Sequence, residues 1–317
     1  MKLTIIYHLY KDIENLKVSL DSLYAQDNKN FEIIFIDDNM SNEVYNIFSQ
    51  YDISNKRIKV ISLQENFGRS YTYNLALSQA KGEYVYFTES RCTFKPNFVS
   101  SIYKIISDNK YDFINFFNES SSSKRTFEFH EFDYKNNKTP SFIVNTKLSI
   151  KDKVFRRKFL NDSKIKFIPF KNFYPLFLFD VFENCKIAYF CNQELINWKT
   201  TKMGTSYNYN LYDILDSALI LYSKIDESQI EDDKKEAYKT WVSILILYEF
   251  IGKIKNSYDN EKIISKSLFN ASELIDKLNF GYKNNKCLDL LLDEDKKHYI
   301  KNFKPTVSYL RKNFKDK

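Results

Sequence analysis

The chain has little glycine, proline, histidine and cysteine. Its 317 residues include 5 Gly, 5 Pro, 3 His and 4 Cys. The cysteines show no CxxC or zinc-type spacing and the histidines are far apart. We therefore expect free thiols in a reducing compartment, not a disulfide framework or a zinc site. Neither a Walker loop nor a GxGxxG motif is present, which argues against the nucleotide-binding enzymes that depend on them.

Long hydrophobic runs are also missing. The apolar run within MKLTIIYHLYKD is too short and too interrupted for a signal peptide. The longest apolar-rich segment, 241–251, is well short of a membrane span. We interpret this segment as a buried helix and expect a cytoplasmic protein.

The excess of positive charge is modest. The chain has 48 Lys and Arg against 41 Asp and Glu, a formal net charge of +7. This balance suits anionic phosphates or a lipid surface but requires neither, and we expect no nucleic-acid partner. Part of the excess lies near the C-terminus, at Lys296, Lys297, Lys301, Lys304, Arg311, Lys312, Lys315 and Lys317. These residues suit a solvated last helix, or peripheral contact with anionic lipid at the inner face of the membrane.

The first 117 residues alternate between short apolar runs and segments with helical spacing. With 43% hydrophobic and 17% aromatic residues, the chain can form a substantial core. Apolar runs at 3–9 and 31–36 predict buried strands, and the segments 57–62, 84–87 and 112–117 predict further strands, with helices between them. This order predicts a doubly wound α/β domain, whose ligands bind beyond the carboxyl ends of the strands.

The remainder of the chain changes character near residue 205. The segment ESSSSKR after Asn118 predicts a loop. Beyond it we expect a short basic helix over 152–160, an aromatic helix over 172–184, strands over 186–190 and 194–198, and helices at 209–225, 231–255, 260–278 and 288–303. The prediction is an α/β domain over 1–205 and a helical region over 206–317. The apolar stripes of the second region suit a core, a homodimer interface or a membrane contact.

Three sequence motifs follow one another between residues 5 and 87. Ile5–Tyr10 and the run SLDSLYAQ come first, then NFEIIFIDDNMSN at 30–42 and ENFGRSYTYNLALSQAKGEYVYF at 65–87. In order and spacing they resemble the motifs of family 2 glycosyltransferases, although His8 and Lys11 replace the usual Pro and Asn. The resemblance covers 3–117 well and 150–207 loosely. It implies a GT-A fold, a Rossmann-like and mostly parallel sheet, with a C-terminal all-helical appendage.

The same resemblance implies a nucleotide site. Asp37 matches the family aspartate that accepts hydrogen bonds from the uracil or ribose, while its neighbour Asp38 suits a strand-end turn. Gly68 and Arg69 lie in the loop that borders the nucleotide in relatives, and Asn74 matches an asparagine whose role is structural or functional. The implied nucleotide- and donor-binding residues are Tyr10, Asp37, Asp38, Gly68, Arg69, Asn74, Glu89 and Arg91.

The metal motif of the family is altered. Relatives carry an Asp-x-Asp after the fourth main strand, and its last Asp binds Mg²⁺ or Mn²⁺. Here the segment reads Glu89-Ser90-Arg91. Glu89 could still ligate a cation, but Arg91 would repel it, so a metal cofactor is doubtful. Two accounts follow: Arg91 itself stabilises the diphosphate through its guanidinium, or the site has decayed.

The position of the general base is altered as well. Asn172 and Phe173 stand where relatives have an acidic pair, and neither can take a proton from an acceptor hydroxyl. Asp180, two turns later, is a candidate base if the helix shifts; otherwise it is a helix-end charge. The segment 196–208 resembles the family's donor-closing loop, and its candidates for sugar or phosphate contact are Trp198, Lys199 and Lys202.

Two functional hypotheses follow from this pattern. The first is an inverting glycosyltransferase of cell-surface polysaccharide or glycoconjugate synthesis, with a UDP-sugar or other nucleotide-sugar donor and a glycan or lipid-linked acceptor. The second is a catalytically inactive relative that binds a partner glycosyltransferase or a glycan. The loss of both the metal ligand and the base favours the second hypothesis, and the intact nucleotide motifs favour the first.

Overall fold

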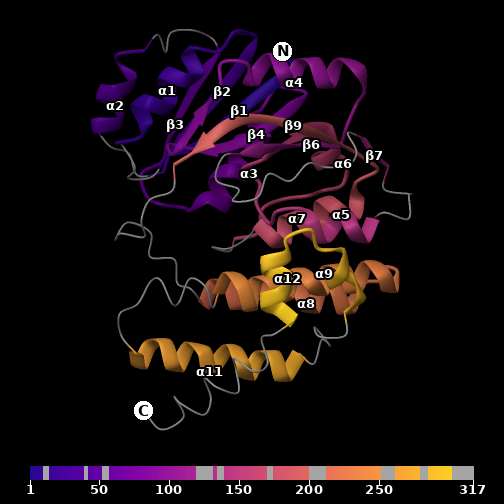
Figure 1. The fold of residues 1–317 in the computed structure, drawn as a ribbon. Coiled ribbons are helices and arrows are strands. Elements are labelled where there is room, and N and C mark those ends of the chain that lie inside the picture. Colours follow the sequence, from indigo (N-terminus) through magenta and orange to yellow (C-terminus); the bar gives the residue numbers. More distant parts are fainter. Residues whose placement is uncertain are drawn as a thin grey trace. The chain divides into compact units, whose positions relative to one another are not determined.

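The computed structural model divides the chain into two compact units (Figure 1). The first contains Met1–Tyr134 and Ser149–Ser206, and the second contains Lys135–Leu148 and Tyr207–Lys317. The structure describes residues 1–9, 14–38, 42–51, 57–118, 131–133, 139–169, 174–199, 212–250, 261–278 and 285–301. Residues 135–148, which the predicted division at 205/206 assigns to the α/β part, pack with the helical unit.

The first unit is built on a mixed sheet whose strand order is β3-β2-β1-β4-β8-β6-β9-β5, with β7 paired to β9. The strands are β1 (Leu3–Leu9), β2 (Phe31–Asp37), β3 (Ile58–Ser62), β4 (Tyr84–Glu89), β5 (Cys92–Phe94), β6 (Phe113–Asn118), β7 (Glu131–Asp133), β8 (Lys153–Arg156) and β9 (Ile187–Trp198). Strands β1 to β4 are parallel to one another in this order. Every residue of β1, β2 and β4 is buried, as their apolar runs predict.

Helices cover both faces of this sheet (Figure 1). They are α1 (Leu16–Tyr24), α2 (Asn42–Phe48), α3 (Arg69–Gln79), α4 (Phe98–Asp108), α6 (Arg157–Asp162) and α7 (Tyr174–Asn184). Leu3, Ile5 and Tyr7 of β1 share one core with the apolar stripes of α1, α2 and α4. Because side chains alternate along a strand, His8 lies on the other face, where its ring contacts Tyr73 of α3. His8 is therefore on the α3 side of the sheet.

Two predictions beyond residue 150 are wrong in detail. The basic segment predicted as a helix over 152–160 begins with strand β8, because Val154 and Phe155 are fully buried between β4 and β6. The two strands predicted at 186–190 and 194–198 form one bulged strand, β9, whose end pairs with β5. Both differences depend on pairing with strands distant in the sequence.

The second unit is helical. It contains α5 (Thr139–Asn145), α8 (Tyr212–Glu227), α9 (Asp232–Ser243), a π-helix η1 (Ile244–Phe250), α11 (Glu261–Leu278), a 3₁₀ turn η2 (Lys286–Leu290) and α12 (Glu294–Lys301). The described part of the predicted helix over 231–255 is thus α9 continued by a π-helix, and that of the one over 288–303 is divided between η2 and α12. The indole Nε1 of buried Trp241 donates to the Ile143 carbonyl at 2.7 Å. Asn145 accepts from Leu292 N and donates to the Leu290 carbonyl, both at 2.8 Å. These bonds hold α5 in the helical unit.

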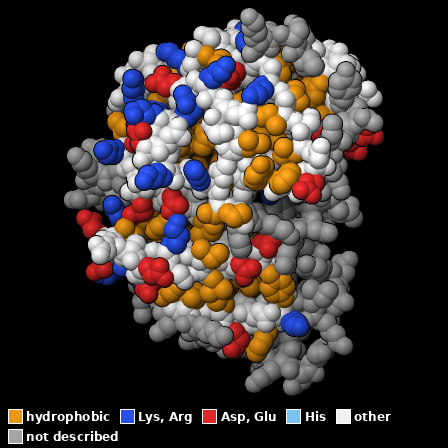
Figure 2. Space-filling view, turned by 180° about the vertical axis from the view of Figure 1, so that it is seen from behind, with side chains coloured by type: hydrophobic (Ala, Val, Ile, Leu, Met, Phe, Trp, Pro, Cys, Tyr) orange, Lys and Arg blue, Asp and Glu red, His pale blue; other side chains and the backbone are white. Residues whose placement is uncertain are grey.

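The described surface is of mixed charge. On the face drawn in Figure 2, lysine and arginine side chains alternate with acidic ones over the described residues, which agrees with the modest net charge. Among the described helices, none combines the length and the apolar character needed to cross a membrane.

Candidate functional site

The carboxyl ends of β1, β2 and β4 meet at one edge of the sheet. In the parallel register His8 is opposite both Ile36 and Glu89, and Leu9 is opposite Asp37. Three polar groups separated by about 80 residues of sequence therefore come together, at the edge where open α/β sheets bind their ligands.

Asp38 anchors the loop that precedes α3. Its fully buried carboxylate accepts hydrogen bonds from Phe67 N at 2.9 Å, Gly68 N at 3.0 Å and His8 Nε2 at 3.2 Å. Gly68 has φ +80°, a conformation that favours glycine. The strand-end turn expected for Asp38 is therefore also the fixing point of the Gly68 loop. Asp37 is buried beside it, and its carbonyl accepts from Leu63 N at 2.9 Å.

Glu89 forms a buried ion pair with Arg69. Oε1 of Glu89 lies 2.9 Å from Nη1 of Arg69 and 3.3 Å from the hydroxyl of Tyr174, at the start of α7. The same Arg69 Nη1 donates to the Tyr174 hydroxyl at 3.2 Å. Burial by itself raises the pKa of Glu89, but the positive charges of Lys151 and Arg69, with the hydrogen bond from Arg69, outweigh it and hold that pKa well below its usual range. Glu89 is therefore an ionised carboxylate surrounded by cations.

Lys151 is a member of this site that the sequence does not reveal. Its ammonium lies 3.6 Å from the centroid of the Trp198 ring. Burial lowers the pKa of Lys151 to about 8; Glu89 opposes this shift, while Arg69 and Arg91 add to it. The motifs point to no role for Lys151, which precedes the helix predicted over 152–160. The antiparallel pairing of β8 with β4 is what brings it to the site.

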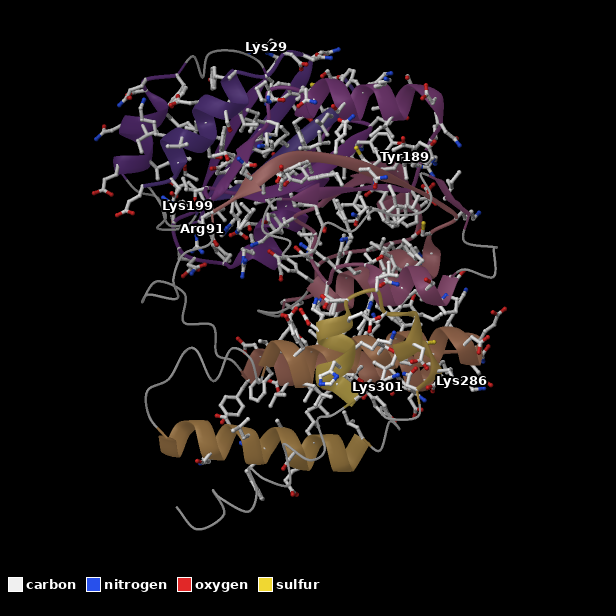
Figure 3. The ribbon with its side chains drawn as sticks, viewed as in Figure 1. Lys29, Arg91, Tyr189, Lys199, Lys286 and Lys301 are labelled. Carbon is white, nitrogen blue, oxygen red and sulfur yellow. The ribbon has the colours of Figure 1, made fainter. Side chains whose placement is uncertain are left out.

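Arg91 and Lys199 occupy the same edge (Figure 3). Lys199 N donates to the Arg91 carbonyl at 3.0 Å, and the Lys199 ammonium reaches Asn15 Oδ1 at 3.0 Å. Trp198, one residue earlier, is paired with Cys92 in the β5–β9 ladder. The structure thus places Trp198 and Lys199 beside Arg91 and Cys92, which follow Glu89 in the chain.

Asn74 and Asp180 are placed elsewhere. Both amide atoms of Asn74 bond the backbone of Phe167, Nδ2 to its carbonyl at 2.7 Å and Oδ1 from its amide at 3.0 Å. Asn74 therefore joins α3 to the segment that precedes α7. Asp180 follows Tyr174 by six residues of α7, about 9 Å along the helix axis and on another face. Tyr10, Asn172, Phe173 and Lys202 lie outside the described residues.

The side chains around Glu89 do not fit a divalent cation. Over the described ranges, no three His, Cys, Asp or Glu side chains converge as metal ligands would. Glu89 is paired with Arg69 at 2.9 Å and has Lys151 as a charged neighbour, and Arg91 acts in turn on Lys151. A divalent cation here would face three positive side chains with one carboxylate, whereas Mg²⁺ and Mn²⁺ prefer several oxygen ligands.

Comparison with known proteins gives the family of the chain. The model of the family "Glycosyl transferase family 2" matches residues 4–169, more than half of the chain. Glycosyltransferase GlyA of Streptococcus pneumoniae is 30% identical over 130 residues, 41% of this chain and 18% of GlyA. The putative teichuronic acid biosynthesis glycosyltransferase TuaG of Bacillus subtilis is 31% identical over 87 residues, 27% of this chain and 34% of TuaG. With two further curated glycosyltransferases, the matches span between 18% and 57% of the relatives' own lengths.

The fold is similar to that of a solved protein. The structure of S. aureus TarS 1-349 superposes with a TM-score of 0.67 at 17% identity, covering 98% of this chain and 89% of that one. Its complex with UDP-GlcNAc gives 0.66 at 19% identity, covering 98% and 90%. Together the matched family model, the parallel β3-β2-β1-β4 half of the sheet and the polar edge establish that the chain belongs to glycosyl transferase family 2 and has the GT-A fold.

Proposed function

We propose that the chain transfers a sugar from a nucleotide-sugar donor, and that cationic side chains take the place of a divalent metal on the donor diphosphate. The observation that carries this proposal is the pair Arg69 and Lys151 beside the carboxylate of Glu89, with Arg91 next to Lys151. Three cations against one carboxylate leave an excess of positive charge where the family places its metal. The doubly charged diphosphate of a nucleotide sugar complements that excess.

Each residue has a definite part in this proposal. Asp38 and Gly68 fix the loop that borders the nucleotide, and Asp37 is the candidate partner of the base or ribose. The planar guanidinium of Arg91 can donate two parallel hydrogen bonds to phosphate oxygens. As the bond between sugar and diphosphate breaks, negative charge grows on the leaving phosphate, so a fixed cation stabilises the transition state more than the ground state.

The donor and acceptor classes follow from the relatives. TarS binds UDP-GlcNAc and UDP in its solved complexes, and TuaG is named for teichuronic acid biosynthesis. These names support a UDP-sugar donor and an acceptor in polysaccharide or glycoconjugate synthesis. Inversion at the transferred sugar is part of the proposal and does not follow from these names. Asp180 is the remaining candidate base, and its place on α7 requires the acceptor or the helix to move toward it.

The proposal is tested by calorimetric titration of UDP and a panel of UDP-sugars, with Mn²⁺ and again with EDTA. We expect the same dissociation constant in both conditions, and a loss of affinity of about tenfold or more in Arg91→Ala. Lys158→Ala is the matched control, because Lys158 is an exposed cation of α6 paired with Asp162. Binding that EDTA abolishes would overturn the metal-independent site.

A catalytically inactive, partner-binding relative is the second candidate. It is favoured by Asn172 and Phe173 at the position of the base, and by the pairing of Glu89 with Arg69 and Tyr174. Incubation with a bound UDP-sugar and a panel of glycan acceptors decides between the two. Release of UDP that depends on the acceptor supports the transferase. Binding without any turnover, for every donor that binds, supports the inactive relative.

A further inference from the structure

Lys151 stands directly beside the carboxylate that replaces the metal motif. Strand β8 runs antiparallel to β4, with Tyr84 opposite Arg156 and Tyr86 opposite Val154. The pairing ends at Val154, and Lys151 lies in the turn just before β8, close enough to Glu89 for their charges to interact. The main chain of Lys151 is held there because the hydroxyl of Tyr86 donates to its carbonyl at 2.8 Å.

The Lys151 ammonium rests on an aromatic ring. It lies 3.6 Å from the centroid of the Trp198 ring, which is a close cation–π contact. Trp198 in turn packs against the core of the first unit, and its backbone pairs with Cys92 next to Arg91. An indole ring attracts a cation without neutralising it. The contact therefore positions the charge of Lys151 and leaves it available to an anion.

The three cations, Arg69, Lys151 and Arg91, differ in the contacts that they make with other protein groups. Arg69 is bonded to Glu89 at 2.9 Å and to Tyr174 at 3.2 Å, so its guanidinium is shared between two protein groups. Arg69 and Arg91 are each close enough to Lys151 for their charges to repel that of its ammonium. Burial, with these two arginines, lowers the pKa of Lys151 to about 8, and Glu89 only partly compensates. The cluster is thus short of negative charge around Lys151.

We propose that Lys151, positioned by Trp198, binds the donor diphosphate and supplies the charge that relatives obtain from a metal ion. This inference rests on the proposed function and assigns the diphosphate contact to a particular side chain. It predicts that Lys151 contributes to recognition of the phosphates and not of the nucleoside. Trp198 is then a positioning residue that acts through Lys151.

The test compares uridine, UMP and UDP by calorimetric titration in EDTA. For the wild-type protein we expect affinity to rise from uridine to UMP to UDP. In Lys151→Met the ratio of UDP to UMP affinity should fall about tenfold or more, with uridine binding unchanged. Lys151→Arg should restore most of the ratio, because a guanidinium also stacks on an indole ring. Trp198→Leu should lower the ratio by a smaller factor.

Lys158→Met is the matched control, since Lys158 follows the opposite end of β8 and is exposed. Circular dichroism and thermal unfolding check that each variant is folded. A wild-type ratio of UDP to UMP affinity in folded Lys151→Met would overturn the role of Lys151 and leave the proposed function standing. Failure of the wild-type protein to bind UDP or any UDP-sugar would overturn both.

Discussion

Replacing Asp38 by alanine should destabilise the first unit strongly. The carboxylate is completely buried, and it is the acceptor for Phe67 N at 2.9 Å, Gly68 N at 3.0 Å and His8 Nε2 at 3.2 Å. Alanine offers no acceptor. The buried His8 ring then loses a charged partner in a place that the surrounding residues keep from water, while the Phe67 and Gly68 amides lose theirs in a partly exposed loop.

The size of the effect can be worked out from these contacts. A hydrogen bond to a charged group contributes about 1.5–3 kcal/mol to stability. Gly68 N also donates to Asn66 Oδ1 at 2.9 Å, so it keeps one partner. Phe67 N and the His8 ring lose the bonds given above. We therefore expect the free energy of unfolding to fall by about 4 kcal/mol, a large part of the roughly 5–15 kcal/mol of an ordinary domain.

Urea unfolding followed by circular dichroism measures this change, and hydrogen exchange of the segment 63–70 shows where it acts. Asp38→Asn retains one acceptor oxygen and should lose about half as much. Asn66→Ala should cost less than about 1 kcal/mol, because Asp38 still accepts from Gly68 N. A loss below about 1 kcal/mol in Asp38→Ala, or unchanged exchange of the loop, would refute the anchoring role.

Three further predictions concern other parts of the molecule. Because burial lowers the pKa of Lys151 to about 8, its protonated fraction falls about tenfold between pH 7 and pH 9; the affinity for a UDP-sugar, measured by titration in EDTA, should fall by the same factor. Lys151→Arg should show a flat profile, and a flat wild-type profile would contradict the idea. In Gly82→Ala the new Cβ would lie 2.5 Å from Thr4 N, so we expect a loss of about 2–3 kcal/mol in urea unfolding; a loss near zero would show that the strands separate easily. Trp241→Phe removes the 2.7 Å bond to the Ile143 carbonyl and should cost about 2 kcal/mol by the same measurement, whereas unchanged stability would mean that α5 is held by packing alone.

The parallel half of the sheet is readable from the sequence because its signals are local. Strands β1, β2 and β4 are buried on both faces, so each is a continuous run of apolar or β-branched residues. The helices between them have apolar residues at helical spacing, as in the stripe of α4 from Phe98 to Ile106. These patterns depend only on neighbouring residues. The predicted strands and helices of this half are confirmed, with ends shifted by a few residues.

The other half depends on contacts that the sequence does not encode locally. β8 is only four residues long and carries Lys153 and Arg156 at its ends, so its pattern resembles that of a basic helix. Lys153 is buried nevertheless, because its ammonium pairs with Asp152 at 2.6 Å and donates to the Ser149 carbonyl at 2.7 Å. α5 joins the helical unit through Asn145 and Ile143. Both placements follow from long-range pairing.

The sequence by itself determined the family, the fold class and the positions of Asp37, Gly68, Arg69, Glu89 and Arg91 relative to the family motifs, because these residues occur in ordered motifs along the chain. The tertiary structure decided how their charges are used. It paired Glu89 with Arg69, joined Asp38 to His8 and the Gly68 loop, and brought Lys151, just before β8, to Trp198 at the end of β9. The physical reason is that charge interactions depend on distance in space. An antiparallel strand from residue 153 and a strand end at residue 198 become neighbours of Glu89 only when the sheet has formed.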